Sequence, residues 1–539
     1  MKRILNTIGL GLLALCFVIS LSRIVMLKFG EQTESGAQVI EIRLAHWQLE
    51  GGVRTAIDAM AAEYMKLHPG VRITQIPIPE RIYRNWLITQ LVGGTAPDII
   101  QVGIGITDER LARFFVPLTD IAQKPNPYNQ GTELENTALR DTFVDGMSGG
   151  FNQNLLEYFG VPISGHTVRL YVNLDLLEKI TGTRNLPTTY DELVALTHQV
   201  DDFSQKQGEQ IIPIAGSRYN SPFLMNALFA SQTQKKMFEL GPPGTLFEVP
   251  ARTTEALLDG EWGLDSSEVR SGLELMREIA AEMQPGFMQV TRDDASFYFV
   301  QGRALMIVTG SWDATSISQQ ANFRFAATQI PLPSKQHPRF GSNVVGLFTE
   351  AGGNAGVSFG LTRGSKHPET AKDFLLFLAG KQTNQLFTNT SKWLPSVLGV
   401  APDPQAKAFM MQSEGYNPGF PLMHGGNRAD TNRLIANNFH YLVGPSGSVE
   451  QFVGAIRSNF VPYILVDLKR EQREITAGIQ RMDVQLAALA EVARNKPKDA
   501  IAQAKFDMIA AAMSARDRAA YFHKNLIRKA EKRIEEDSK

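Results

Sequence analysis

Two hydrophobic patterns follow one another along the first part of the chain. Short alternating or apolar runs, typical of strands, occupy residues 39–47, 71–78 and 99–102, and apolar residues at helical spacing occupy 53–67 and 83–92. Strands and helices in this order, with short connections, predict a parallel sheet covered by helices. Ligands of such sheets bind at the carboxyl ends of the strands, which directs attention to Trp47–Gly52 and Gln101–Gly105.

The same patterns return between residues 159 and 378. Strands are predicted at 159–163, 168–173, 304–308 and 357–361, and helices at 173–180, 190–200 and 367–378. A chain of 539 residues is too long for one simple core, so two or more domains are expected. The fold class that follows is α/β.

The C-terminal region carries a different pattern. Residues 463–494 and 501–526 each hold a heptad-like apolar stripe, and Asn495–Lys498, with Pro497, interrupts them. Two long helices joined by a tight turn predict an antiparallel helical hairpin over residues 463–535.

The N-terminus has the plan of an export signal. Basic Met1–Arg3 precede an apolar stretch within residues 4–27. Two interpretations stay open for residues 1–30. Small residues at Ser20 and Ser22 fit a cleaved signal peptide, whereas apolar sequence resuming after Arg23 fits a retained transmembrane anchor. Both place the rest of the chain in the periplasm or another extracytoplasmic space.

The composition argues against several classes of function. With 54 basic and 55 acidic residues the net charge is −1, which argues against nucleic acid as the main partner. One cysteine excludes an internal disulfide framework and any CxxC metal site, and nine scattered histidines offer little for a metal cluster. The chain contains no nucleophile elbow, zinc-protease, P-loop or EF-hand motif. Asp293–Asp294 is interpreted as a helix start. We therefore expect a protein that is not an enzyme and uses no cofactor or metal.

Several segments resemble those of a known protein family and follow one another in that family's order. They are AIDAMAAEYMKLHPGV (56–71), GGTAPDII (93–100), VPISGHTVRLYVNLDLLEK (161–179), LPTTYDELV (186–194), FVQGRALMIVTGSWD (299–313) and GSKHPETAKDFLLFLAG (364–380). Over residues 41–457 the chain resembles the bacterial extracellular solute-binding proteins of the sugar-binding class, the receptors of ABC importers. The resemblance implies a two-lobe periplasmic-binding-protein (Venus flytrap) fold, to which the C-terminal hairpin is an addition.

The resemblance also implies how the chain is divided. Residues 39–150 and 356–395 are expected to form lobe one, and residues 151–355 and 396–460 to form lobe two. The two lobes should be joined by crossing strands and close on a ligand.

Candidate ligand-binding residues follow from the family's site positions and from the strand ends. Aromatic rings offer stacking platforms to a sugar, and polar side chains bond its hydroxyls. The candidates are Trp47, Glu50, Gln101, His166, Thr167, Tyr219, Trp312, Asp313, Asn427 and Arg428. Structural alternatives stay open: Trp312 as a core residue, Asp313 as a helix cap, and Arg428 as a tie between the lobes. Gly103 and Gly105 stand where a maltodextrin-binding relative carries contacts, so its specificity should not be transferred.

The expected function is reversible capture of a neutral carbohydrate, an oligosaccharide by preference, and its delivery to an ABC permease in the inner membrane. Two alternatives remain. One is an envelope sensor or assembly subunit that uses the same fold. The other is a glycan-active enzyme with two distant carboxylates in the cleft. The C-terminal hairpin itself is expected to bury its two stripes against each other and to lean on lobe two, and its outer surface is a candidate docking site for a partner protein.

Overall fold

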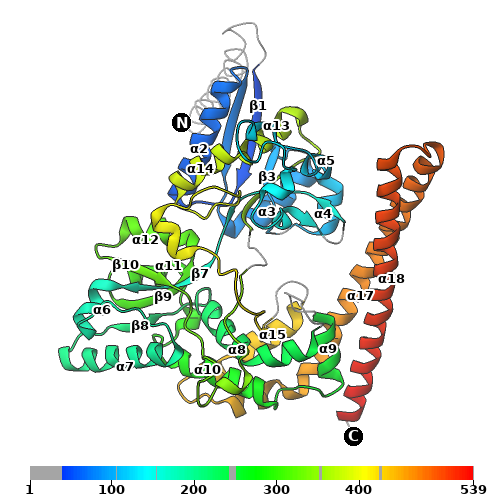
Figure 1. Ribbon diagram of the computed structural model, residues 1–539. Helices are drawn as coiled ribbons and strands as arrows, with labels where there is room; N and C mark the ends of the chain where they lie inside the picture. The colour runs from blue at the N-terminus through cyan, green and yellow to red at the C-terminus, as the bar shows by residue number, and fades with distance from the viewer. Residues whose placement is uncertain are drawn as a thin grey trace, which may run out of the picture.

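Two α/β lobes lie one above the other, with a long helical hairpin beside them (Figure 1). The computed structural model describes residues 39–104, 106–152, 155–241, 250–350, 355–423 and 428–537. The strands of the two main sheets are β1 (Ile40–His46), β2 (Val71–Pro77), β3 (Ile99–Gln101), β6 (Val161–Gly165), β7 (Val168–Asn173), β8 (Ile212–Ala215), β9 (Ala304–Gly310), β10 (Phe325–Thr328) and β11 (Ala355–Leu361). β4 (Phe151–Asn152) and β5 (Glu157–Tyr158) form a small separate ribbon.

The helices cover the sheets and build the hairpin. In chain order they are α2 (Gly51–Leu67), α3 (Glu80–Gly93), α4 (Asp108–Phe114), α5 (Thr119–Ala122), α6 (Leu174–Thr181), α7 (Tyr190–Gln207), α8 (Ser221–Leu240), α9 (Pro250–Leu258), α10 (Ser267–Ala281), α11 (Arg292–Val300), α12 (Ala314–Gln320), α13 (Pro368–Leu378), α14 (Lys381–Ser391), α15 (Ala429–Asn438), α16 (His440–Val443), α17 (Val449–Asn495) and α18 (Ala500–Asp537). The α/β class, the two-lobe fold and the added helical hairpin predicted from the sequence are therefore present.

Lobe one is built on a five-stranded sheet in the order β2-β1-β3-β11-β6. β1 pairs in parallel with β2 and β3, whereas β11 is antiparallel to both β3 and β6. Ile42 and Leu44 of β1 are fully buried under Met60 and other apolar residues of α2. The alternating pattern of residues 39–47 is thus explained by one buried sheet face.

Lobe two is built on a four-stranded sheet in the order β10-β7-β9-β8. β7 is antiparallel to β10 and β9, and β8 is parallel to β9. All seven residues of β9 are buried, as expected of a central strand covered on both faces.

The predicted boundary between the lobes at residue 150 is placed too early. β6 belongs to the sheet of lobe one because it pairs with β11, so the first strand of lobe two is β7. The boundary at residue 395 is also early: Val397 and Val400 pack in the lobe-one core, whereas Phe409 packs in lobe two. Sequence patterns show that a segment is a strand or a loop, but not which sheet it joins.

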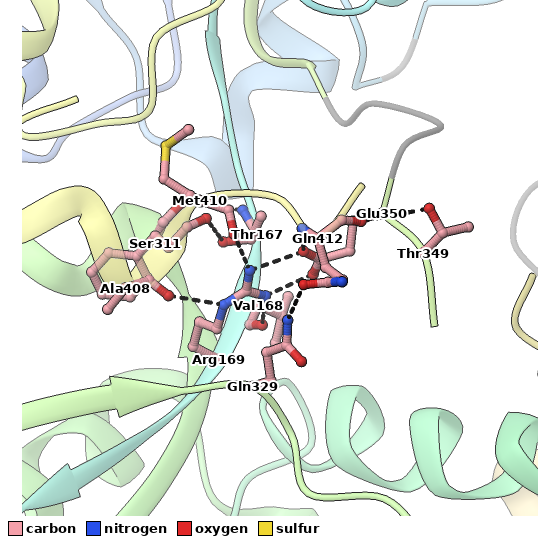
Figure 2. Close-up of polar contacts among 11 residues, drawn as sticks. Thr167, Val168, Arg169, Ser311, Gln329, Thr349, Glu350, Ala408, Met410 and Gln412 are labelled. Atoms are coloured by element: carbon pink, nitrogen blue, oxygen red, sulfur yellow. Dashed lines mark hydrogen bonds and ion pairs between the residues drawn. The ribbon is translucent and has the colours of Figure 1, made fainter. Parts of the chain in front are cut away.

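Three segments cross between the lobes, and the buried side chain of Arg169 fastens two of them to β7 (Figure 2). Its guanidinium pairs with both carboxylate oxygens of Glu350, at 2.6 and 2.9 Å. It also donates to the backbone carbonyls of Val168, Ala408 and Met410. All five N–H donors of this side chain are therefore used, which fixes the crossing segments against one another.

The hairpin begins earlier than predicted. α17 starts at Val449, with Ser448 as its N-cap, and continues through Pro462 instead of starting at Tyr463. An interior proline removes one helix hydrogen bond and would ordinarily break a helix. Here Phe460 and Ile464 on either side of it are buried in the lobe-two core, and this packing holds the helix together.

The expectations for the N-terminal segment, residues 1–30, lie outside the described residues. Within the part of the chain that is described, no helix combines the length and apolar character needed to cross a membrane.

Candidate functional site

A cavity of about 160 Å³ lies between the two lobes. Its lining residues come from both sheets and from the crossing segments: Trp47, Gln48, Glu50, Glu80, His166, Tyr219, Arg292, Trp312, Gly356 and Trp393. Five of the ten residues predicted as ligand contacts are among them, namely Trp47, Glu50, His166, Tyr219 and Trp312. Four tryptophan or tyrosine rings together with charged side chains in one cavity suit a ligand that has both an apolar face and polar groups.

Lobe one supplies the loop that follows β1. The Trp47 ring meets Tyr83 edge to face at 4.9 Å, and the Trp47 backbone N–H donates to Gln101 Oε1 at 3.2 Å. The Tyr83 hydroxyl in turn donates to the Gln101 backbone carbonyl at 2.8 Å. Gln101 is fully buried, so it orients the Trp47 loop from behind and does not line the cavity.

Gln48 joins this loop to Glu50. With its amide oriented to suit its neighbours, Gln48 accepts from Trp47 Nε1 at 3.2 Å and from Gln101 Nε2 at 2.8 Å, and donates to Glu50 Oε2 at 3.2 Å. Burial raises the pKa of the Glu50 carboxyl, although nearby Arg292 opposes that rise. Glu50 is also the N-cap residue of α2, but its side chain forms no cap hydrogen bond there.

Lobe two supplies Arg292, the first residue of α11. Its Nη2 lies 2.5 Å from Asp313 Oδ1 and 3.8 Å from Glu50 Oε1, so this guanidinium faces carboxylates of both lobes. It also lies over the Tyr219 ring at 5.0 Å from the centroid. Burial lowers the pKa of Arg292, but the carboxylates around it outweigh that effect and the net pKa is raised. Arg292 therefore stays charged.

Asp313 binds the Arg292 guanidinium, and the rest of its side chain is buried. It accepts from Thr309 Oγ1 at 2.5 Å and is only 8 % exposed. Its side chain forms no cap hydrogen bond to α12, so the cap alternative is wrong. Burial raises the pKa of the neighbouring Tyr219 hydroxyl to about 12, which keeps it protonated as a hydrogen-bond donor.

Trp312 lies at the meeting point of the lobes. It follows β9 of lobe two, yet its ring packs against the core of lobe one. His166 approaches it at a centroid distance of 5.3 Å and Phe223 at 6.1 Å. A side chain at Gly310 would lie 2.3 Å from the indole ring, so glycine at that position makes room for it. Among the residues that the structure describes, no group bonds the buried Trp312 Nε1.

Two of the other candidates lie away from the cavity. Thr167 is buried and its hydroxyl donates to the Phe409 carbonyl at 2.7 Å, which ties two crossing segments together. Arg428 is 7 % exposed and lies near Thr254 and Glu471, beneath α9 and beside α17. It therefore joins parts of lobe two, and the expectation that it reaches the cleft or ties the lobes is wrong. Asn427 lies outside the described residues.

Five lining residues of the cavity were not among the predicted ligand contacts: Gln48, Glu80, Arg292, Gly356 and Trp393. Glu80 is exposed in the first turn of α3, where an acidic residue is commonplace. Arg292 follows the N-cap Thr291 in a segment interpreted only as a helix start. Trp393 lies just after α14, in a loop to which no role was assigned. Only the tertiary contacts bring them to the site.

Comparisons with known proteins agree with this architecture. A family profile described as bacterial extracellular solute-binding protein matches residues 59–411. An uncharacterised ABC transporter extracellular-binding protein of Pyrococcus horikoshii is 22% identical over 390 residues, which is 70% of this chain and 77% of the relative. A putative ABC transporter periplasmic-binding protein of Escherichia coli is 20% identical over 342 residues, which is 63% and 68% of the two chains.

Solved structures share the fold. The GacH receptor of Streptomyces glaucescens, studied unliganded and with acarbose, superposes with a TM-score of 0.55 at 14% identity, over 78% of this chain and 98% of its own. A maltose-bound binding protein of T. maritima gives 0.53 at 18% identity, over 78% and 99%. At such identities the likeness shows the fold alone. The family match ends before α17, so it does not account for the hairpin.

Proposed function

The chain belongs to the bacterial extracellular solute-binding proteins, the receptors of ABC transporters, and from that premise we propose that it captures a carbohydrate between its lobes and delivers it to a permease. The observation that supports the carbohydrate is the cavity between the lobes, where Trp47, Tyr219, Trp312 and Trp393 lie among Glu50, His166 and Arg292. Sugars bind through aromatic stacking on their apolar faces and through hydrogen bonds to their hydroxyls. The structural neighbours named above were solved with acarbose and with maltose.

Binding proceeds by closure of the lobes. Trp47 and Glu50 belong to lobe one, and Tyr219 and Arg292 to lobe two, so a ligand that touches both groups favours the closed arrangement. The permease would recognise that arrangement. No bond is made or broken in this function, in keeping with relatives that are binding proteins.

The family's location is extracytoplasmic, and residues 1–30 supply the export signal in our proposal. Cell fractionation with mass spectrometry of the mature N-terminus decides between a cleaved peptide and a membrane tether. Recovery of the chain in the cytoplasm would contradict the proposal.

The first test is a calorimetric screen of mono- and oligosaccharides against the whole protein. We expect at least one sugar to bind reversibly and to raise the melting temperature, with no product formed on prolonged incubation. Turnover of a bound oligosaccharide would favour the glycan-active enzyme instead.

Replacing Trp312 by alanine tests the cavity itself. If the indole is a stacking platform, Trp312→Ala weakens binding of the sugar found in the screen by about 1–3 kcal/mol. Trp86→Ala is the matched control, since Trp86 lies on α3 outside the cavity and should leave the affinity unchanged. Unchanged affinity in a folded Trp312→Ala protein would remove that ring from the site.

A further inference from the structure

The charges around the interlobe cavity do not cancel. Glu50 and Glu80 of lobe one both line it, and Arg292 is the one lysine or arginine among the described lining residues. Arg292 is already matched by Asp313, whose Oδ1 lies 2.5 Å from its Nη2. Its distance to Glu50, 3.8 Å, exceeds that of a hydrogen bond. The cavity thus holds an excess of negative charge at the lobe-one side.

Among the described lining residues, Glu80 is the exposed and unpaired source of that negative charge. Its side chain is exposed, and within the described parts of the chain no ion pair or hydrogen bond to its carboxylate is found. Burial is the main cause of the raised pKa values of Glu50 and Tyr219, and the negative charge of Glu80 adds to both. Two carboxylates facing the same space repel each other unless a cation lies near them.

The aromatic residues of the cavity place two further requirements on its ligand. Their π faces attract a cation held within about 6 Å. Two indole N–H groups, Trp312 Nε1 and Trp393 Nε1, are buried with no hydrogen-bond partner among the described residues. Buried donors of this kind are usually satisfied, and both tryptophans line the cavity, so a ligand that reaches these donors needs acceptor oxygens. A simple polyamine has no such oxygens, whereas a sugar has several.

We propose that the carbohydrate taken up by this cavity carries a protonated amine. The ammonium lies between the Glu50 and Glu80 carboxylates, and oxygens of the sugar accept from the two tryptophan N–H groups. This inference rests on the proposed function and replaces the neutral sugar expected from the sequence with an amino sugar. Anionic sugars are disfavoured, because Arg292, which carries the only guanidinium among the described lining residues, is already paired with Asp313.

The test is titration calorimetry of the whole protein with matched sugars. Glucosamine, galactosamine and mannosamine are compared with their N-acetylated forms and with glucose, galactose and mannose, as monomers and as β-1,4-linked dimers, at a pH where the amine is protonated. We expect an amine-bearing member to bind on the order of tenfold more tightly than its neutral counterparts, and added salt to reduce that difference.

Glu80→Gln supplies the matched variant. It should remove most of the preference for the amine, measured as the ratio of amino-sugar to neutral-sugar affinity within the same variant. Glu369→Gln is the control, because Glu369 also lies exposed in the first turn of a helix, α13, and should change neither. This control separates the charge in the cavity from the effect of an acidic residue on its helix.

The outcomes separate this inference from the function on which it rests. Neutral sugars that bind as tightly as the amino sugars, or a preference that survives Glu80→Gln, overturn the inference and leave the carbohydrate receptor standing. Binding of neutral sugars with no binding of amino sugars also overturns the inference and leaves the carbohydrate receptor standing. Failure of every sugar in this panel overturns the inference, and failure of the wider saccharide screen described above overturns the carbohydrate receptor as well.

Discussion

Arg169 is a single side chain on which the joining of the lobes depends. It is 2% exposed, and its partners Glu350, Ala408 and Met410 lie on the two other crossing segments. We predict that Arg169→Met lowers the free energy of unfolding by about 3 kcal/mol, because it leaves two carbonyls without donors and the Glu350 carboxylate without its cation, with the Gln412 N–H as its remaining donor. Chemical denaturation measures this. Arg72→Met, an exposed position on β2, is the control, and a loss no larger than the control's would show that the crossing segments are held by other contacts.

His46 should make the stability of the protein depend on pH. This side chain of β1 is fully buried, Nε2 bonds Gln75 Oε1 at 2.7 Å, and burial lowers its pKa to about 4. The unfolded chain has the ordinary value near 6.5, so between these two values the unfolded state binds more protons. Stability contributed by neutral His46 is therefore present above the unfolded pKa and is lost as the pH falls towards 4, by up to about 3 kcal/mol.

Denaturation curves recorded across this pH window check the effect. His46→Asn should flatten the pH dependence relative to the unsubstituted protein, whereas the surface variant His440→Asn should retain it. Equal slopes in all three proteins would mean that folding does not lower the pKa of His46.

The site residues show what can be learned from single positions. The positions after strand ends led to Trp47, Glu50 and Trp312, which the structure brings to one cavity, because strand ends of both sheets meet at the interlobe face. Arg292 could not be identified, since its partner Glu50 is far away in the sequence and on the other lobe. Arg428 was misplaced for the converse reason: a match to one of the family's site positions does not show that the side chain turns toward Glu471 of α17.

At the scale of elements, local capping signals are the most reliable guide. The sequence Thr188-Thr189-Tyr190-Asp191 predicted the start of α7, and at that start the Thr189 and Glu192 side chains form a complete capping box. We predict that Thr189→Ala lowers the free energy of unfolding by about 1 kcal/mol, because the Glu192 backbone N–H loses its acceptor. Thermal or chemical denaturation measures this.

A matched change refines that experiment. Glu192→Gln keeps a hydrogen-bonding side chain at the third position of the helix and should cost less than Thr189→Ala. A larger loss for Glu192→Gln would indicate that its contacts with Thr188, and not the cap, stabilise this end of the helix.

In contrast, the local sequence pattern does not show which sheet or lobe a strand joins, or where a long helix ends. β6 was correctly expected near residues 159–163 but was given to the wrong lobe, because its pairing with β11 depends on residues far along the chain. Likewise, α17 continues through Pro462, where helix propensity alone predicts an end. In both cases long-range packing overrides what the local sequence favours.

At the scale of the whole molecule, the hairpin has two parts with different roles. Its root belongs to lobe two: Ile464 and Leu468 of α17 and Leu526 and Ala530 of α18 are buried in that core. Asp467, 1% exposed, accepts hydrogen bonds from Thr431 in α15. The distal part extends alongside lobe one (Figure 1), where Lys505 Nζ lies 3.6 Å from Asp120 Oδ1.

These contacts predict opposite results for two truncations. Deleting residue 467 onward should prevent lobe two from folding, because loss of each large buried side chain costs about 2–5 kcal/mol.

Replacing residues 478–515 by a short glycine-serine turn keeps the root, and should leave a folded protein whose sugar affinity lies within about threefold of the original, a change below 1 kcal/mol. The Lys505–Asp120 pair is lost in that variant, but its side chains are 39% and 72% exposed, and such surface pairs contribute little. Circular dichroism and calorimetry with the sugar from the screen measure folding and affinity. If the shortened protein folds but no longer binds sugar, the distal hairpin shapes the cleft from lobe one's side; if the longer deletion stays fully stable, the root is not part of the core.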